Sequence, residues 1–180
     1  DFAVGAGDDA TGHGLDAGVL EGVGREVERS GDQVELVVGD RHVLAQRRAF
    51  PVACYLSYAL SQLERPATLM DGVGGMLHEQ ARGIGPRDVL VAVSFRNYSP
   101  EVIALAADCH RRRVPVVVIT DSPMSPLHGA ASLAFDLGDH SDRPFRSLVE
   151  PMCLALVLVV SLGYRTAGHG ARAPAGRRRT

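Results

Sequence analysis

Three segments of the 180-residue chain combine hydroxyl or guanidinium side chains with a proline. They are residues 46–51 (QRRAFP), 94–100 (SFRNYSP) and 120–126 (TDSPMSP). Proline suits the first position of a helix, and Ser99 and Ser125 stand directly before theirs, where they can cap the helix. Free backbone N–H groups at a helix start, with hydroxyls beside them, form a site for an anion. The sequence therefore predicts a phosphate-binding site.

Arginines in the same segments strengthen this prediction, because their planar guanidinium groups match pairs of phosphate oxygens. The candidate ligand-binding residues are Arg47, Arg48, Ser94, Arg96, Ser99, Thr120 and Ser125. The ligand expected is a small phosphorylated polyol, whose hydroxyls would contact the other polar groups. The alternative remains open that the two serines before proline only cap helices and that the arginines are solvated.

The 19 cationic side chains of the chain are all arginine, and lysine is absent. This absence excludes Schiff-base aldolases and pyridoxal enzymes, which need a lysine amine. It also excludes P-loop NTPases, in which a lysine contacts the phosphates. We attribute the absence mainly to GC-rich coding, which also fits the single Asn and the lack of Trp.

Charge divides the chain into three regions. Residues 1–40 carry ten acids and two arginines, a net charge of −8, whereas residues 165–180 carry five arginines and no acid. The region between them is nearly balanced, and the total of −2 favours neither nucleic acid nor a membrane surface as a partner. We predict an acidic, Gly-rich segment over 1–40, partly linker or helical, one domain over 41–163 and a disordered basic tail over 164–180.

The cysteines and histidines indicate no redox or metal chemistry. Cys54, Cys109 and Cys153 each fall in an apolar helical pattern, which predicts reduced, packed side chains in the cytoplasm. The histidines show no paired ligand spacing, so neither a metal nor another cofactor is expected. No signal peptide is visible, and the apolar run 152–162 is shorter than the roughly 20 residues that span a bilayer.

The elements that must position the three segments follow from the apolar pattern. Apolar runs predict strands at 43–45, 67–70, 89–93, 114–119 and 133–137, and helical periodicity predicts helices from Pro51 to the residue before Pro66 and over 76–82, 100–112 and 145–163. Apolar strands that alternate with helices indicate a parallel sheet covered on both faces, a doubly wound α/β layout. Ligands of such sheets bind beyond the carboxyl ends of the strands, where the three segments fall.

Five stretches of the chain carry a family resemblance: RRAFPVACYLSYAL, LMDGVGGMLHEQ, DVLVAVSFRNYSPEV, VPVVVITDSPMSPL and FRSLVEPMCLAL. Over roughly residues 41–163 the chain resembles the SIS (sugar isomerase) domain, and more narrowly the effector domain of RpiR/MurR-type bacterial transcription regulators. In SIS domains the loop after the central strand commonly reads S-x-S-G-x-T-x-E and binds the sugar phosphate. Ser94, Ser99 and Glu101 match its first Ser, its Thr position and its Glu, whereas Arg96 and Asn97 replace its second Ser and its Gly.

The resemblance implies an α/β fold, a three-layer αβα sandwich with a five-stranded parallel sheet in a flavodoxin-like layout. It also implies a homodimer or tetramer that responds to a sugar phosphate or a related phosphorylated metabolite. Regulators of this type bind DNA through an N-terminal helix-turn-helix domain, which needs a basic surface that the acidic residues 1–40 do not offer. The chain also begins without Met. We therefore expect either a fragment that controls DNA through a domain absent from this chain or a stand-alone SIS protein.

The runner-up function is an aldose–ketose isomerase. Such an enzyme needs a positioned base, and the candidates are Glu79, Glu101, His128 and Glu150. Isomerases with this fold often also use a lysine, which the chain lacks, so the sequence favours a sensor and assigns no catalytic residue. A further open point is the apolar helix over 147–162, which packs either inside the domain or against another subunit.

Overall fold

The computed structural model describes residues 39–63, 67–138 and 147–170, with side chains as far as Tyr164 in the last range. The predictions made for residues 1–38 and for the tail beyond 170 lie outside the described residues. The strands are β1 (Arg41–Ala45), β2 (Ala67–Met70), β3 (Val89–Val93), β4 (Val116–Thr120) and β5 (Leu133–Asp136). The α-helices are α2 (Phe50–Gln62), α3 (Leu77–Arg82), α4 (Pro100–Arg111) and α5 (Val149–Gly170), and the 3-10 helices are η1 (Arg47–Ala49), η2 (Val73–Gly75) and η3 (Pro126–Ala130).

The five strands form one sheet in the order β2-β1-β3-β4-β5, and every neighbouring pair is parallel. The register places Ala45 beside Val93 and Val93 beside Ile119. The carboxyl ends of β1, β3 and β4 therefore meet at one edge of the sheet. This arrangement confirms the predicted five-stranded parallel sheet.

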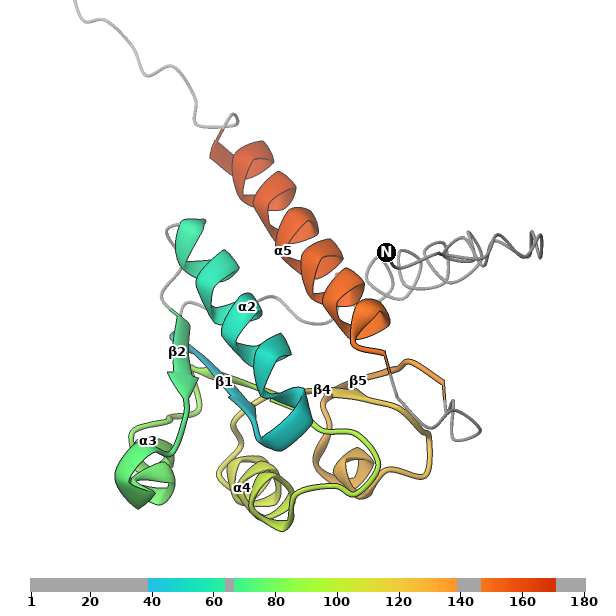
Figure 1. Cartoon of the computed structure of the whole chain (residues 1–180). Helices are drawn as coiled ribbons and strands as arrows, with labels where there is room; N and C mark the ends of the chain where they lie inside the picture. Colours follow the sequence, from blue (N-terminus) through green and yellow to red (C-terminus); the bar gives the residue numbers. More distant parts are fainter. Residues whose placement is uncertain (1–38, 64–66, 139–146, 171–180) are drawn as a thin grey trace, which may run out of the picture.

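Helices cover both faces of the sheet, as the apolar strands require. α2 and α5 pack over one face, while α3, α4 and η3 pack over the other (Figure 1). Side chains alternate along each strand, so that Val91 belongs to the core beneath α2 and α5 and Ala92 to the core beneath α4. The three-layer αβα sandwich predicted from the sequence is confirmed.

Most element boundaries differ from those predicted, and the differences at β4 and α5 show how proline and glycine act in this fold. β4 begins at Val116 instead of residue 114 and ends at Thr120, because Pro115 has no N–H to donate to the ladder and lies before the strand. α5 covers 149–170 instead of 145–163, continuing past Gly163. A Cβ atom at Gly163 would lie 3.3 Å from Leu63 Cδ2, so the glycine lets α5 and the end of α2 approach closely.

The apolar helix α5 divides its side chains between the core and the surface. Leu154, Ala155 and Val159 are buried against the sheet and α2, whereas Leu156 and Val160 remain 49% and 45% exposed. Intradomain packing therefore accounts for one side of the helix, and the other side is left uncovered by the described residues.

Candidate functional site

The strand order reverses between β1 and β3: the chain adds β2 on one side of β1, and β3, β4 and β5 on the other. These two strands flank the start of the candidate site. The helix after β1 lies on one face and the helix after β3 lies on the other, so their N-termini open on either side of a crevice at this point. Ligands of doubly wound sheets bind at such a switch point. The segments 46–51 and 94–100 begin there, and 120–126 follows the adjacent strand β4.

Two contacts join the loop after β1 to the loop after β3. The Ser99 hydroxyl donates a hydrogen bond to Gln46 Oε1, and the Arg48 guanidinium lies 5.8 Å from the centre of the Phe95 ring. Ser99 does occupy the N-cap position of α4, but its hydroxyl caps no backbone N–H there. The prediction that this hydroxyl caps the helix is therefore wrong: the side chain is oriented toward Gln46 across the switch point and accepts from no backbone N–H of α4.

The serines at the two ends of the loop after β3 are both buried. The backbone N–H of Ser99 donates to Ser94 Oγ at 3.4 Å, which closes the loop on itself. The backbone N–H of Ser94 donates to Ile119 O at 3.1 Å and so continues the sheet ladder with β4. These contacts hold both predicted hydroxyls in buried positions at the carboxyl edge of the sheet, between β3 and α4.

A carboxylate that the sequence did not single out joins the loops after β3 and β4. Asp121, which is 6% exposed, accepts hydrogen bonds from the Arg96 backbone N–H at 2.8 Å and from the Tyr98 hydroxyl at 2.9 Å. Burial, and next the adjacent Asp121 carboxylate, raise the pKa of Tyr98, so the phenol stays protonated and donates. The sequence signal for Asp121 was its place directly after an apolar strand.

The loop after β4 contains one confirmed cap and one hydroxyl without a hydrogen bond. Ser125 Oγ accepts from the Leu127 N–H at 3.4 Å, so Ser125 caps η3 as predicted. Thr120 Oγ1 is fully buried near the Tyr98 hydroxyl, yet it meets hydrogen-bond geometry with no described residue. A buried hydroxyl in that state is a candidate contact for a bound molecule.

Two non-glycine residues at the site adopt a left-handed backbone conformation. Arg47 has φ of 54° and Asn97 has φ of 67°. Asn tolerates this region better than other residues with a side chain. Asn97 stands where the SIS loop commonly has Gly, so its conformation explains why the replacement is possible. Strained residues of this kind cluster at functional sites.

The structure thus brings together residues from all three predicted segments. Ser94, Ser99, Thr120 and Ser125 are buried at the carboxyl edge of the sheet, and Arg47, Arg48 and Arg96 are exposed in the same loops. Sequence reasoning missed the roles of Gln46, Phe95, Tyr98 and Asp121, each of which contacts a residue of another loop.

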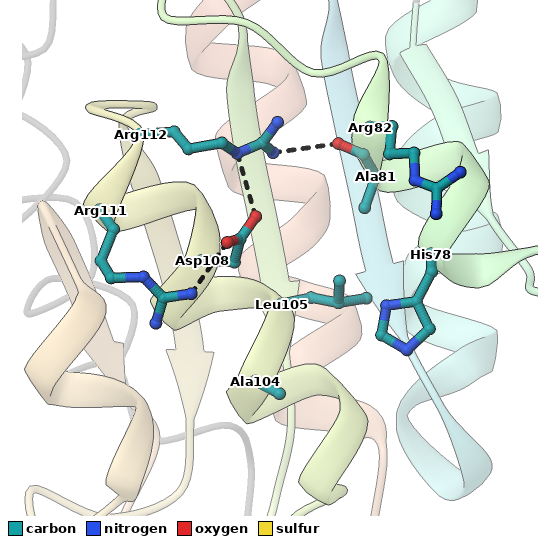
Figure 2. Close-up of a pocket in the computed structure, with 8 residues that line it drawn as sticks. All are labelled: His78, Ala81, Arg82, Ala104, Leu105, Asp108, Arg111 and Arg112. Atoms are coloured by element: carbon teal, nitrogen blue, oxygen red, sulfur yellow. Dashed lines mark hydrogen bonds and ion pairs between the residues drawn. The ribbon is translucent and has the colours of Figure 1, made fainter.

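A separate groove of about 390 Å³ lies between α3 and α4 (Figure 2). Its lining consists of His78, Ala81, Arg82, Ala104, Leu105, Asp108, Arg111 and Arg112, and includes none of the seven candidate residues. Arg112 donates to Ile84 O at 3.1 Å and to Ala81 O at 3.0 Å, and Asp108 pairs with both Arg112 and Arg111. The arginine contacts therefore tie the end of α4 to α3.

The described residues contain neither a cluster of metal-ligating side chains nor a membrane-spanning helix. Within 39–63, 67–138 and 147–170, no three His, Cys, Asp or Glu side chains gather as a metal site would require. None of the helices in these ranges has the length and hydropathy to cross a bilayer. The three cysteines are free, and Cys109 is buried in the core beneath α4.

Fold and loops together define a doubly wound α/β domain whose candidate ligand site lies between the loops after β1, β3 and β4. The chain belongs to the SIS domain family, whose family model matches residues 40–161. A comparison with curated proteins finds no match.

Solved structures of low sequence identity share this fold. The sugar isomerase domain of an RpiR transcription factor from Sphaerobacter thermophilus is 18% identical, with a TM-score of 0.69 over 87% of this chain and 94% of that chain. The NanR protein of Vibrio vulnificus, complexed with ManNAc-6P, is 20% identical, with a TM-score of 0.65 over 87% of this chain and 66% of that chain. A Methanococcus jannaschii protein with an inferred function of 3-hexulose-6-phosphate isomerase is 10% identical, with a TM-score of 0.58 over 89% of this chain and 82% of that chain.

Proposed function

We propose that this chain is a cytoplasmic effector domain that senses a sugar phosphate and controls DNA binding by a helix-turn-helix domain absent from this chain. The observation that carries the proposal is the gathering of buried hydroxyls and exposed arginines at the carboxyl edge of the sheet, where the strand order reverses between β1 and β3. The regulators of similar fold support it, since one is an RpiR transcription factor and another is complexed with ManNAc-6P.

Each group of candidate residues has a role in this proposal. The buried hydroxyls of Ser94, Ser99, Thr120 and Ser125 contact the polyol, because short neutral groups suit neutral hydroxyls. Arg47, Arg48 and Arg96 hold the phosphate, for which guanidinium groups supply paired donors. A ligand that combines a phosphate with a polyol therefore requires both the hydroxyls and the arginines.

The uncovered side of α5 provides a subunit contact in the proposed regulator. Val149, Leu156, Val160 and Tyr164 lie 45–79% exposed along this helix, and Tyr58 on the adjacent α2 is 65% exposed. Apolar side chains grouped in this way mark an interaction surface. We expect a homodimer in sedimentation experiments, and Leu156→Glu should yield a monomer; a wild-type monomer at high concentration would contradict this part of the proposal.

A thermal-shift screen against hexose, hexosamine and pentose phosphates tests ligand sensing. A ligand at a hundred times its Kd stabilises a protein by about 2.7 kcal/mol, which is well within detection. Ser94→Ala and Ser99→Ala should abolish the shift while the protein stays folded. Ser61→Ala is the matched control, because this exposed hydroxyl bonds only the Ser57 carbonyl of its own helix. If no phosphorylated compound raises the melting temperature, the proposal fails.

One contact favours the alternative, a sugar-phosphate isomerase. His128 Nε2 lies 2.9 Å from Asp136 Oδ1, and a histidine oriented by a carboxylate is an arrangement that can move a proton. Of the other candidate bases, Glu79 and Glu101 are exposed, and Glu150 is half-buried in the first turn of α5. Turnover of the stabilising compound, followed by NMR and lost in His128→Asn, would establish the isomerase; no turnover leaves the sensor.

A further inference from the structure

The phenol of Tyr98 reaches from the loop after β3 to polar side chains at the end of β4. Its hydroxyl donates a hydrogen bond to Asp121 Oδ1 at 2.9 Å, and the hydroxyls of Thr120 and Ser125 lie near the same oxygen. Asp121, Thr120 and Ser125 are all buried, whereas Tyr98 is half-buried. The end of β4 therefore presents a buried cluster of one carboxylate and two hydroxyls, and an alcohol group of the protein itself occupies this cluster.

The phenol does not satisfy every member of the cluster. Thr120 Oγ1 meets hydrogen-bond geometry with no described residue, although buried hydroxyls usually have a partner. Side chains alternate along β4, so Thr120 lies on the same face as Val118, beneath α4 and η3. A hydroxyl can donate one hydrogen bond and accept two. A small alcohol bound at this place can therefore donate to Asp121 and accept from Thr120 at the same time.

The backbone beside Tyr98 is held in a conformation that favours release of the phenol. Asn97 has φ of 67° and lies between Arg96 and Tyr98, which both donate to Asp121. A left-handed conformation costs free energy for a residue with a side chain, although asparagine tolerates it better than most. When the phenol leaves, the Arg96 N–H keeps its bond to Asp121 Oδ2, and Asn97 loses one of the two contacts that flank it. Residues 97 and 98 can thus turn outward while the start of the loop stays in place.

We propose that the Tyr98 hydroxyl occupies the position of a ligand hydroxyl, and that an alcohol group of the bound polyol replaces the phenol on Asp121 and also bonds Thr120. A sugar hydroxyl has the same donor and acceptor groups as the phenol and belongs to a smaller group. Its entry turns Tyr98 out of the cluster and so changes the surface at the start of α4. This inference rests on the proposed function and specifies the chemical group that the inner end of that same site recognises.

Two other roles of Tyr98 predict different effects when its hydroxyl is removed. Under exchange, Tyr98→Phe binds the polyol more tightly, because the ligand no longer has to break a hydrogen bond to a carboxylate before it enters. A phenol that contacts the ligand directly would make the variant bind more weakly. A phenol that only joins the two loops would leave the affinity unchanged or reduce it. The direction of the change therefore separates exchange from both alternatives.

Sorbitol 6-phosphate and inorganic phosphate, titrated by isothermal calorimetry, are the probes. The first is an open-chain polyol whose hydroxyls can adapt to the inner end of the site, and the second has no polyol. We expect Tyr98→Phe to bind sorbitol 6-phosphate at least fivefold more tightly than the wild type, with the affinity for inorganic phosphate within twofold. An equal or weaker affinity for sorbitol 6-phosphate, or an equal gain for both probes, overturns the inference. Tyr55→Phe is the matched control, because this phenol belongs to α2, outside the three loops, and it should change neither affinity.

NMR of the wild type decides the question even if Tyr98→Phe does not fold. The chain has four tyrosines, Tyr55, Tyr58, Tyr98 and Tyr164, whose phenol carbons can be labelled with carbon-13. The Tyr98 signal is the one that Phe variants of the other three retain. Saturating sorbitol 6-phosphate should move this signal toward that of a solvated tyrosine; an unmoved signal with the probe bound, or no binding to either protein, sinks the inference.

Failure of the proposed function looks different. It fails only if no phosphorylated compound of the thermal-shift screen stabilises the wild type. A stabilising compound together with an unchanged or weaker affinity in Tyr98→Phe would overturn the exchange at Tyr98 and leave the sensor intact.

Discussion

Arginine has opposite surroundings in the α3–α4 groove and at the carboxyl edge of the sheet. In the groove, Arg112 donates to the Ala81 carbonyl and pairs with Asp108, a carboxylate that Arg111 shares (Figure 2). Arg112 also donates to Ile84 O. At the sheet edge, Arg48 is exposed and lies over the face of an aromatic ring. The partners of a guanidinium, more than its presence, therefore separate a structural arginine from a candidate ligand-binding one.

The two regions also differ in the residues that they bury, which are apolar in the groove and polar at the sheet edge. The groove has an apolar floor of Ala81 and Leu105 below a charged rim. The sheet edge instead buries hydroxyls and the Asp121 carboxylate beneath exposed arginines. Burying polar groups costs free energy unless they are hydrogen-bonded. Most of these groups are, but Thr120 Oγ1 has no hydrogen-bond partner among the described residues, which marks this edge as the candidate site.

Arg112→Ala should produce the largest effect on stability. The substitution removes charged hydrogen bonds to Ile84 O and Ala81 O, and such bonds contribute about 1.5–3 kcal/mol each. We expect the free energy of unfolding to fall by about 2–4 kcal/mol in urea titrations, with unchanged phosphate affinity.

Arg111→Ala is the matched control, because this exposed side chain only pairs with Asp108 at the surface. Its effect on the free energy of unfolding should stay within about 0.5 kcal/mol. Equal losses in the two variants, or a loss of phosphate affinity in Arg112→Ala, would break the distinction between the two regions.

Arg113→Gly should have a smaller effect and the opposite sign. Arg113 follows α4 with φ of 63°, and the bonds from Arg113 N to His110 O and from Val114 N to Cys109 O form a Schellman motif, in which glycine is preferred. Relief of the left-handed strain should raise the free energy of unfolding by about 1 kcal/mol.

Asn97→Gly provides the comparison at the site. Asn97 has a similar φ of 67° but tolerates it better than arginine does, so glycine should change stability there by only a few tenths of a kcal/mol. Urea titrations of both variants measure the difference. A larger gain at Asn97 than at Arg113 would mean that the strain is concentrated at the site.

Local sequence signals were sufficient for the fold. Each of the five predicted strands overlaps a strand of the structure, and Pro51, Pro100 and Pro126 each lie in the first turn of a helix. The five-stranded, flavodoxin-like layout came from the family resemblance. The structure adds the strand order and the register, which places the three loops at one edge. Apolar runs and helix starts depend on neighbouring residues in the chain, which is why they can be predicted from the sequence.

The contacts of the site depend on residues distant in sequence, and these were missed. Ser99 and Gln46 are 53 positions apart, and Arg96 and Asp121 are 25 apart. From spacing alone, a serine before proline predicts a cap, which is correct for Ser125 and wrong for the Ser99 hydroxyl. Only the folded loops show that the Ser99 hydroxyl is oriented toward Gln46 and away from the N–H groups of α4.

The smallest predicted effect is a pH dependence at the amino edge of the sheet, away from both regions compared above. His42 in β1 has a buried Nδ1 without a hydrogen-bond partner among the described residues. Burial lowers the pKa of His42 below 6.5, and the nearby Asp88 and Asp40 carboxylates only partly oppose this. The unfolded chain therefore binds the proton more readily than the folded one.

Stability should consequently be constant above pH 6.5 and should decline as the pH falls below this value, since protonation then favours the unfolded chain. Urea titrations from about pH 8 to about pH 5 measure the decline. His42→Gln removes the titrating ring and should flatten the part of the profile just below pH 6.5, because glutamine carries no charge in either state. A profile identical to that of the wild type would show that another group causes the decline. Phosphate affinity should be the same in both proteins at each pH, because His42 lies at the opposite edge of the sheet from the loops after β1, β3 and β4.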